Sequence, residues 1–209
     1  MSELQLPVVV DVQKGTFAGW QKVTLSDGSF FCALSALLRE EACDVPGAVI
    51  SVIQGSLLEQ QSWHIYVRQK AMASLARAEQ SRFHLQQKLL AKGCPRDAVD
   101  TVLGDLQQKN LLSDERFALA WARNRMEKKG ESARQVIIGL RQRGISQCTA
   151  ESSVKQIIQD DPGLPQKALE RAADKILLKC DDYQLASLKL RRLGFPADKI
   201  VEFFEEISR

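Results

Sequence analysis

One helix ending occurs three times in this chain at nearly equal intervals, and this repeat constrains the fold more than any other feature. The copies start at Ser81, Ser132 and Asp182 and align without a gap as SRFHLQQKLLAKG, SARQVIIGLRQRG and DYQLASLKLRRLG. Their final glycines lie 51 and then 50 positions apart. A period of this length is typical of one supersecondary unit that is stacked so that neighbours bury what a single unit leaves exposed. The sequence therefore predicts three similar units in tandem.

Each copy opens with a residue that can cap a helix and closes with a residue that can end one. A Ser or Asp at the first position accepts hydrogen bonds from free amides of the first turn. In the middle copy, Gln135 can complete a capping box with Ser132. The closing glycine suits the left-handed conformation that ends a helix. A further helix start follows each glycine, at Pro95, Ser146 and Pro196.

These signals predict a three-helix bundle in each unit. A longer first helix and the glycine-terminated second helix are followed by a third, which is expected at 96–109, 147–159 and 197–207. Apolar residues recur at the same two places in every copy, as the core positions of amphipathic helices do. They are Leu89, Leu140 and Leu190, and then Leu103, Val154 and Phe204.

The first helix of the middle unit is the best defined. It is expected to run from its cap Ser113 to Gly130 without a break. Phe117 and Trp121 are four residues apart and share one helix face, so we expect both side chains in the core.

The first 62 residues are built differently. Val8-Val9-Val10 with Val12 forms a β-branched run, and Asp27-Gly28 lies between two apolar runs, a pattern that predicts a β-hairpin. A short helix is expected at 34–41, whereas 46–60 fits a strand or a helix equally well. We therefore expect a mostly α fold, in which a tandem array of three three-helix bundle repeats follows a small β-hairpin-containing N-terminal segment. The expected divisions are the segment 1–62 and the repeats 63–112, 113–160 and 161–209.

Charge is distributed unevenly along the chain. Residues 1–62 carry 3 Lys and Arg against 7 Asp and Glu, whereas the three expected repeats have net charges of +4, +3 and 0 in chain order. The positive excess on the first two repeats suggests an anionic partner, either nucleic acid or an acidic protein surface. Helical surfaces also carry Lys and Arg for solubility, so charge alone does not decide the matter.

Cysteine usage and hydropathy indicate a compartment. An odd number of cysteines without a C-x-x-C pair argues against a disulfide framework and for a reducing environment. No apolar run reaches the length of a membrane span, and the N-terminus has no basic region followed by a hydrophobic stretch. We expect a cytoplasmic protein. The five cysteines are Cys32, Cys43, Cys94, Cys148 and Cys180.

The sequence carries no motif for catalysis, cofactor binding or metal binding. His64 and His84 are the two histidines, and neither has a further ligand at metal-binding spacing. Lys14-Gly15-Thr16 lacks the glycine pattern of a phosphate loop. Acidic pairs such as Asp181-Asp182 are better explained by capping and solvation than by acid or base catalysis. We therefore expect a binding protein that is not an enzyme and has no cofactor.

Four segments, taken together in order and spacing, resemble the RecX family of recombination regulators. They are residues 75–93, 111–130, 140–145 and 190–195, which read LARAEQSRFHLQQKLLAKG, LLSDERFALAWARNRMEKKG, LRQRGI and LRRLGF. Each alone is a generic amphipathic helix. The resemblance implies tandem three-helix units, no enzymatic activity, and binding to the RecA recombinase filament, usually with restraint of its ATP hydrolysis and strand exchange. The N-terminal segment resembles the extension of longer members less closely.

The resemblance implies a monomeric regulator in recombination, DNA repair and the SOS response, with only weak or indirect contact with DNA. Basic side chains of the repeats are the candidate contacts with the RecA filament. They are Lys88, Lys92, Arg123, Arg125, Lys128, Lys129, Arg134, Arg141, Arg143, Arg191 and Arg192.

Two alternatives remain open. In a stand-alone helical-repeat DNA-binding protein, arginines of the glycine-terminated helices would reach phosphates or guanine edges. The modest net charge of +3 and the lack of a basic arm argue against a strong grip on DNA. A helical scaffold for an unrelated protein partner is the second alternative.

Overall fold

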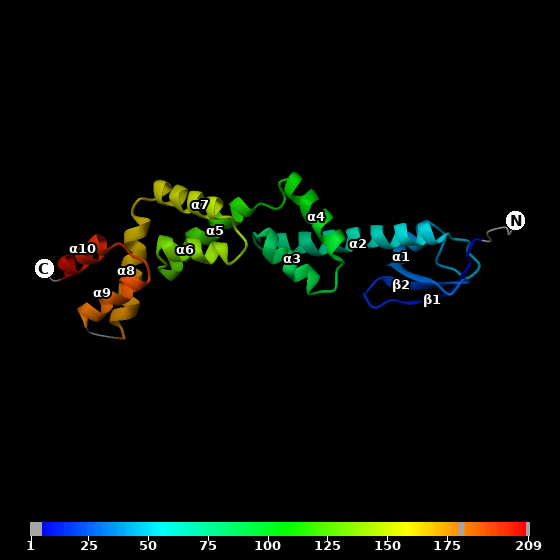
Figure 1. Cartoon of the computed structure of the whole chain (residues 1–209), viewed down its shortest axis with the longest axis horizontal. Helices are drawn as coiled ribbons and strands as arrows, with labels where there is room; N and C mark the ends of the chain where they lie inside the picture. The colour runs from blue at the N-terminus through cyan, green and yellow to red at the C-terminus, as the bar shows by residue number, and fades with distance from the viewer. Residues whose placement is uncertain (1–5, 180–181, 208–209) are drawn as a thin grey trace. The chain divides into compact units, whose positions relative to one another are not determined.

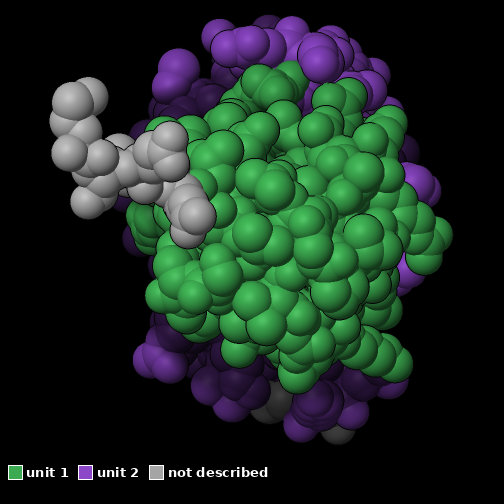
Figure 2. All heavy atoms as spheres, turned by 90° about the vertical axis from the view of Figure 1, so that its right-hand side faces the viewer, with its two compact units in different colours: residues 1–73, 88–105 green, residues 74–87, 106–209 purple. Residues whose placement is uncertain are grey.

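The computed structural model describes residues 6–179 and 182–207, and over this part the chain is mostly helical (Figure 1). A three-stranded antiparallel sheet precedes the helices, which confirms the predicted fold class. The chain forms two compact units, which Figure 2 colours separately. Unit 1 contains residues 1–73 and 88–105, and unit 2 contains 74–87 and 106–209.

The sheet of unit 1 contains the predicted hairpin. Its strands are ordered β1 (Val9–Lys14), β2 (Trp20–Leu25) and β3 (Phe30–Leu34). The turn between β2 and β3 has Gly28 at φ +83°, and the Asp27 carboxylate accepts a hydrogen bond from the Ser29 amide at 2.9 Å. This combination of a positive φ and a side-chain-stabilised turn is the chemistry that an Asp-Gly pair supplies.

A short helix and a long one complete the N-terminal region. The helix predicted at 34–41 is α1 (Ser35–Glu40), and α2 runs unbroken over Val52–Leu75. The ambiguous stretch 46–60 is therefore helical from Val52 onward. The boundary expected after residue 62 falls inside α2, because that helix packs against the sheet at its beginning and continues into the first repeat.

Close packing in unit 1 explains why α2 begins beside the sheet. A Cβ atom at Gly55 would lie 2.8 Å from the Phe31 ring, so the missing side chain lets α2 approach β3. The buried Ser62 hydroxyl accepts a hydrogen bond from the Leu34 amide at 2.9 Å. Rings of Phe17 and Trp20 also pack on Trp63 of α2, with centroid separations of 5.3 and 4.5 Å.

Helices of the repeats follow in the predicted order. The second half of α2, α3 (Arg82–Leu90) and α4 (Arg96–Gln108) correspond to repeat 1. Repeat 2 has α5 (Asp114–Asn124), the π-helix η1 (Arg125–Lys129), α6 (Ala133–Arg141) and α7 (Gln147–Asp160). Repeat 3 has α8 (Leu164–Leu177), α9 (Tyr183–Arg192) and α10 (Ala197–Ile207). The helix predicted from the cap Ser113 to Gly130 has the expected extent, and its last turn widens into η1.

The predicted caps are present. Ser132 accepts a hydrogen bond from the Gln135 amide at 3.2 Å, and the two residues form the expected capping box. Asp182 accepts hydrogen bonds from the amides of Gln184 and Leu185 at 2.8 and 3.2 Å. The closing glycines all have left-handed backbones, with φ values of +79°, +80° and +86° at Gly93, Gly144 and Gly194.

Most of the predicted core positions are buried. Leu89, Leu140 and Leu190 are at most 2% exposed, and Leu103 and Val154 are also buried. The prediction for Phe204 is wrong, because that side chain is only partly buried. Its neighbour Phe203 takes the core position of α10 and is 6% exposed.

Phe117 and Trp121 lie at the rim of the core of repeat 2. Both side chains pack against it, but both are partly exposed. Their neighbours Ala118 and Ala122 are fully buried and face the centre of the cluster. The two side chains therefore pack against the core as expected, but they are less buried than core side chains.

Successive repeats are joined in unit 2 by a hydrogen bond that occurs twice. The hydroxyl of the cap Ser81 donates to the carbonyl of Arg143 at 2.9 Å. The hydroxyl of the cap Ser132 donates to the carbonyl of Leu193 at 2.5 Å. In both cases the acceptor directly precedes the closing glycine of the next repeat. Each buried serine thus caps its own helix and binds the following unit.

The same two glycines also permit close approach between repeats. A Cβ atom at Gly144 would overlap the Cβ of Phe83, and one at Gly194 would lie 2.9 Å from the Cβ of Arg134. Phe83 and Arg134 occupy equivalent positions, two residues after their caps. The first turn of each glycine-terminated helix is therefore the docking surface for the next repeat.

Candidate partner-binding surface

Two of the predicted arginines are brought together on the rim of repeat 2. The guanidinium carbons of Arg125 and Arg143 lie 4.9 and 4.5 Å from the centroid of the Trp121 ring. Arg125 comes from η1 and Arg143 from the turn that follows α6. Guanidinium groups at such distances are attracted by the negative charge of the ring face, so Trp121 fixes the position of both charges.

A glycine makes this arrangement possible. A Cβ atom at Gly139 would lie 2.5 Å from the Trp121 ring, and the Gly139 carbonyl accepts a hydrogen bond from Arg143 at 2.8 Å. The sequence analysis did not single out Gly139. Its signal is a glycine in the middle of an amphipathic helix, which lowers helix stability and so points to a packing requirement.

The π-helix η1, which carries Arg125, is held in place by two further contacts. Arg125 also forms an ion pair with Glu131 at 3.3 Å. The Lys129 carbonyl accepts a hydrogen bond from the side chain of Lys175, at 2.6 Å, which ties η1 to α8. Short π-helices within α-helices are frequent at functional sites.

The other predicted basic residues have different surroundings. Arg123 is exposed and forms an ion pair with Asp160 at 3.2 Å, so part of its charge is neutralised. Arg191 and Arg192 project from repeat 3, and Lys88 and Lys92 belong to unit 1. Of the other predicted contact residues in repeat 2, the exposed ones are Lys128, Lys129, Arg134 and Arg141.

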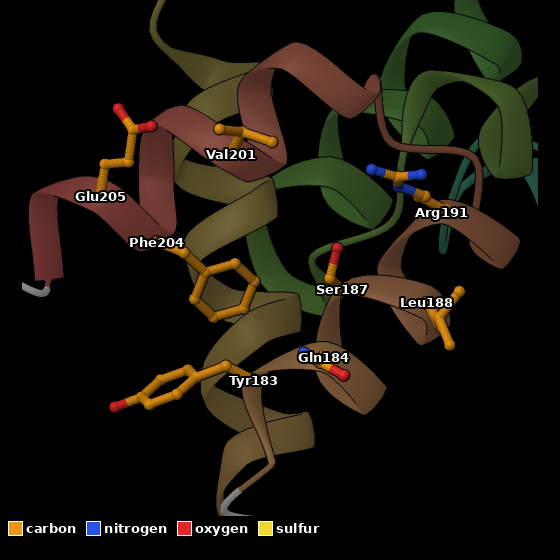
Figure 3. Close-up of a pocket in the computed structure, with 8 residues that line it drawn as sticks. All are labelled: Tyr183, Gln184, Ser187, Leu188, Arg191, Val201, Phe204 and Glu205. Carbon is orange, nitrogen blue, oxygen red and sulfur yellow. The ribbon is translucent and has the colours of Figure 1, made fainter.

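A groove between α9 and α10 of repeat 3 is a site that the sequence analysis missed (Figure 3). It has a volume of about 720 Å³. Leu188 projects from α9 and Val201 from α10, and the rings of Tyr183 and Phe204 lie edge to face, 5.5 Å apart. Leu188 is 54% and Val201 46% exposed, so the groove presents apolar surface to solvent.

The described part of the chain has no cluster of side chains that could bind a metal ion. Among residues 6–179 and 182–207, no group of three or more His, Cys, Asp and Glu side chains could hold a metal ion. Cys32, Cys43, Cys94 and Cys148 are free thiols, and burial raises the pKa of the Cys94 thiol. Cys180, like Asp181, lies outside the described residues. Among the described helices, none combines the length and the apolar character needed to cross a bilayer.

Comparison with known proteins gives a consistent family. A model of the first three-helix domain of RecX matches residues 68–106, and one of the second three-helix domain matches residues 113–153. The regulatory protein RecX of Corynebacterium efficiens is 31% identical over 148 residues, which cover 67% of this chain and 70% of that protein. The regulatory protein RecX of Treponema pallidum is 37% identical over 90 residues, which cover 43% and 55%.

Solved structures share the fold. A crystal structure of a regulatory protein RecX superposes with a TM-score of 0.66 at 16% identity and covers 96% of this chain and 100% of its own. The crystal structure of RecX from Lactobacillus salivarius has a TM-score of 0.59 at 18% identity and covers 71% and 98%. The chain thus has the same helical fold as these two solved structures. The chain belongs to the RecX family.

Proposed function

We propose that this chain binds the RecA recombinase filament on DNA and slows its ATP hydrolysis and strand exchange during recombination and DNA repair. Membership of a family of regulatory proteins carries the proposal. Arg125 and Arg143, which pack on Trp121 and form the basic rim of repeat 2, support it. Preorganised arginines suit an anionic surface such as a nucleoprotein filament.

A protein that binds the filament can slow its cycle of ATP hydrolysis without catalysing a step of it. A ligand shifts a conformational equilibrium only by binding one state more tightly than another. Subunits of an ATP-hydrolysing filament change their relative orientation during turnover, and interfaces between subunits switch between discrete arrangements. A chain whose consecutive repeats contact neighbouring subunits would favour one arrangement and slow the step that leaves it. No catalytic group of the regulator is required for this effect.

DNA contacts are expected to be weak. The basic rim provides phosphate contacts, which release counterions and are strongly salt-dependent. Phosphate contacts position a protein but do not read sequence. We therefore propose that DNA is bound mainly as part of the filament, by a monomeric chain in the cytoplasm, and that a stand-alone DNA-binding function is the alternative.

A test combines the purified chain with a RecA-type recombinase and single-stranded DNA. ATP hydrolysis and strand exchange should fall when the chain is added at equimolar or lower ratios, and the chain alone should hydrolyse no ATP. The matched measurement is its affinity for the same DNA without recombinase, at physiological salt. Unchanged recombinase turnover together with tight binding to naked DNA would replace the regulator proposal with the DNA-binding alternative.

A further inference from the structure

The glycine-terminated helix of repeat 2 has a glycine where the other two repeats have a lysine. In the gapless alignment of the three helices, Gly139 is matched by Lys88 and Lys189. A glycine inside a helix destabilises it, because its backbone loses more conformational freedom on folding than that of any other residue. The three-helix plan does not require this loss, since repeats 1 and 3 form the same helix with a side chain at this position.

Trp121, which packs against this glycine, is also particular to repeat 2. The spacings of 51 and 50 residues that relate the closing glycines lead from Trp121 back to Lys70 and forward to Arg171. A Cβ atom at Gly139 would lie 2.5 Å from the Trp121 ring, so the glycine leaves the space that the ring fills. The two departures from the repeat pattern therefore serve one arrangement, the packing of the basic rim on the ring.

The basic rim holds two like charges close together. The guanidinium groups of Arg125 and Arg143 lie near the same ring centroid and repel each other. The ring face and the Glu131 carboxylate, which lies 3.3 Å from Nε of Arg125, offset part of this repulsion. Two cations and one carboxylate leave this group with one excess positive charge. Both arginines are only partly buried, so an anion in solution can reach them.

Exposed basic residues on the same elements show which anion fits. Lys128 and Lys129 follow Arg125 in η1, and Arg141 lies two residues before Arg143. One acidic side chain can pair with one of these charges, whereas a nucleic acid backbone offers a phosphate to each of them. Arginine also matches the geometry of phosphate with two parallel hydrogen bonds. The rim therefore fits the phosphate backbone of DNA better than an isolated carboxylate.

We propose that Trp121 is a positioning residue that holds Arg125 and Arg143 ready to bind backbone phosphates of the DNA in the recombinase filament. The inference rests on the proposed function and names the ligand of its charged surface. A side chain that is already ordered loses less conformational entropy on binding. Trp121 thus raises affinity without adding a charge, whereas each arginine adds both affinity and the release of a counterion.

The test separates affinity from salt dependence in the full-length chain. Binding of each variant to RecA filaments on fluorescent single-stranded DNA is titrated at several salt concentrations. Trp121→Leu should weaken binding by about three- to tenfold, and the slope of log affinity against log salt concentration should stay the same because both arginines keep their charge. Arg143→Gln should weaken binding and also make this slope shallower by about one.

Matched variants control for the loss of a ring, of a charge and of stability. Trp121→Phe keeps an aromatic face and should retain most of the affinity. Arg171→Gln removes an exposed arginine of repeat 3 and should leave the slope unchanged. Gly139→Ala replaces Trp121→Leu if circular dichroism shows that the leucine variant has lost helix. Alanine favours the helix while its Cβ displaces the ring, so this variant should show the same loss of affinity.

The outcomes distinguish this inference from the proposed function. Unaltered filament binding by Trp121→Leu or by Gly139→Ala would overturn the positioning role. A weaker Arg143→Gln complex with an unchanged slope would overturn the phosphate contact, with an acidic side chain of the recombinase as the ligand instead. The same titrations are made on single-stranded DNA without recombinase at low salt. If the unaltered chain leaves the filament unbound but Arg143→Gln still makes the DNA slope shallower, the proposed function fails and the phosphate site stands.

Discussion

Repeats 2 and 3 share one helical plan but present different surfaces. Repeat 2 has a net charge of +3 and holds Arg125 and Arg143 against Trp121. Repeat 3 has no net charge and opens an apolar groove around Leu188 and Val201. Both repeats have a capping residue and a closing glycine at the positions that define the plan. This comparison indicates that local signals at helix ends specify the three-helix repeat. The exposed residues between these ends differ from one repeat to the next and give each repeat its own surface.

The cap residues show the same contrast at closer range. Ser132 is 2% exposed and both accepts and donates a hydrogen bond, because repeat 3 docks on it. Asp182 is exposed and only accepts. A cap that contacts a following repeat, as Ser132 does, therefore needs a hydroxyl, whereas the exposed cap of repeat 3 tolerates a charge. Substitutions at the repeat junctions, at the caps and at exposed charges can break or sharpen this comparison.

The largest effect is expected at the repeat junctions. Gly144→Ala should lower the free energy of unfolding by about 3 kcal/mol, the sum of a left-handed alanine and the overlap with Phe83. Gly194→Ala should cost about 2 kcal/mol, because part of its contact is the flexible side chain of Arg134. Chemical denaturation followed by circular dichroism measures both values.

Gly93→Ala is the matched control for the two junctions. Gly93 has the same left-handed backbone, but a Cβ atom there would meet only the Phe17 ring at 3.9 Å, an ordinary contact distance. The substitution should therefore cost only the backbone term, about 1 kcal/mol. Equal losses from all three alanines would mean that the glycines act through φ alone and that close approach between repeats contributes nothing.

The cap substitutions should differ by a smaller amount. Ser132→Ala removes a helix cap and leaves the part-buried Leu193 carbonyl without its donor, so it should cost about 2 kcal/mol. Asp182→Ala removes an exposed cap only and should cost less than about 1 kcal/mol. Denaturant midpoints of the two variants test the difference. A larger loss from Asp182→Ala would contradict the assignment of Ser132 as a junction residue.

Helix ends could be predicted because their chemistry is local. A Ser or Asp cap and a glycine with a positive φ act within one turn, so Ser132, Asp182 and Gly194 were predicted at the right positions. Core positions depend on rotation about the helix axis, where neighbouring residues differ by about 100°. A one-residue error therefore exchanged the buried Phe203 for the partly exposed Phe204.

The binding surfaces were less predictable because they combine distant residues. Trp121 and Arg125 are four residues apart, a spacing that predicts contact on a helix, but Arg143 joins them only through the packing of α6. The π-helix at Arg125–Lys129 has no comparable local signal. The groove exists because α9 and α10 leave Leu188 and Val201 exposed, which depends on how these helices pack rather than on their periodicity.

The smallest effect is expected from exposed charges. Lys128→Glu with Lys129→Glu reverses two exposed charges of repeat 2, and Lys179→Glu with Arg192→Glu does the same in repeat 3. If the exposed basic side chains of repeat 2 face the filament, the first pair should weaken filament binding by about three- to tenfold at low salt, because exposed charge pairs contribute little each. The second pair should change binding less than twofold.

Binding titrations over a range of salt concentrations should also show a shallower salt dependence for the first pair alone, since fewer favourable charge contacts remain to be screened. Circular dichroism checks that both variants are folded. Equal losses from the two pairs would mean that the filament responds to overall charge, and the contrast between a charged repeat 2 and an apolar repeat 3 would then have no role in binding.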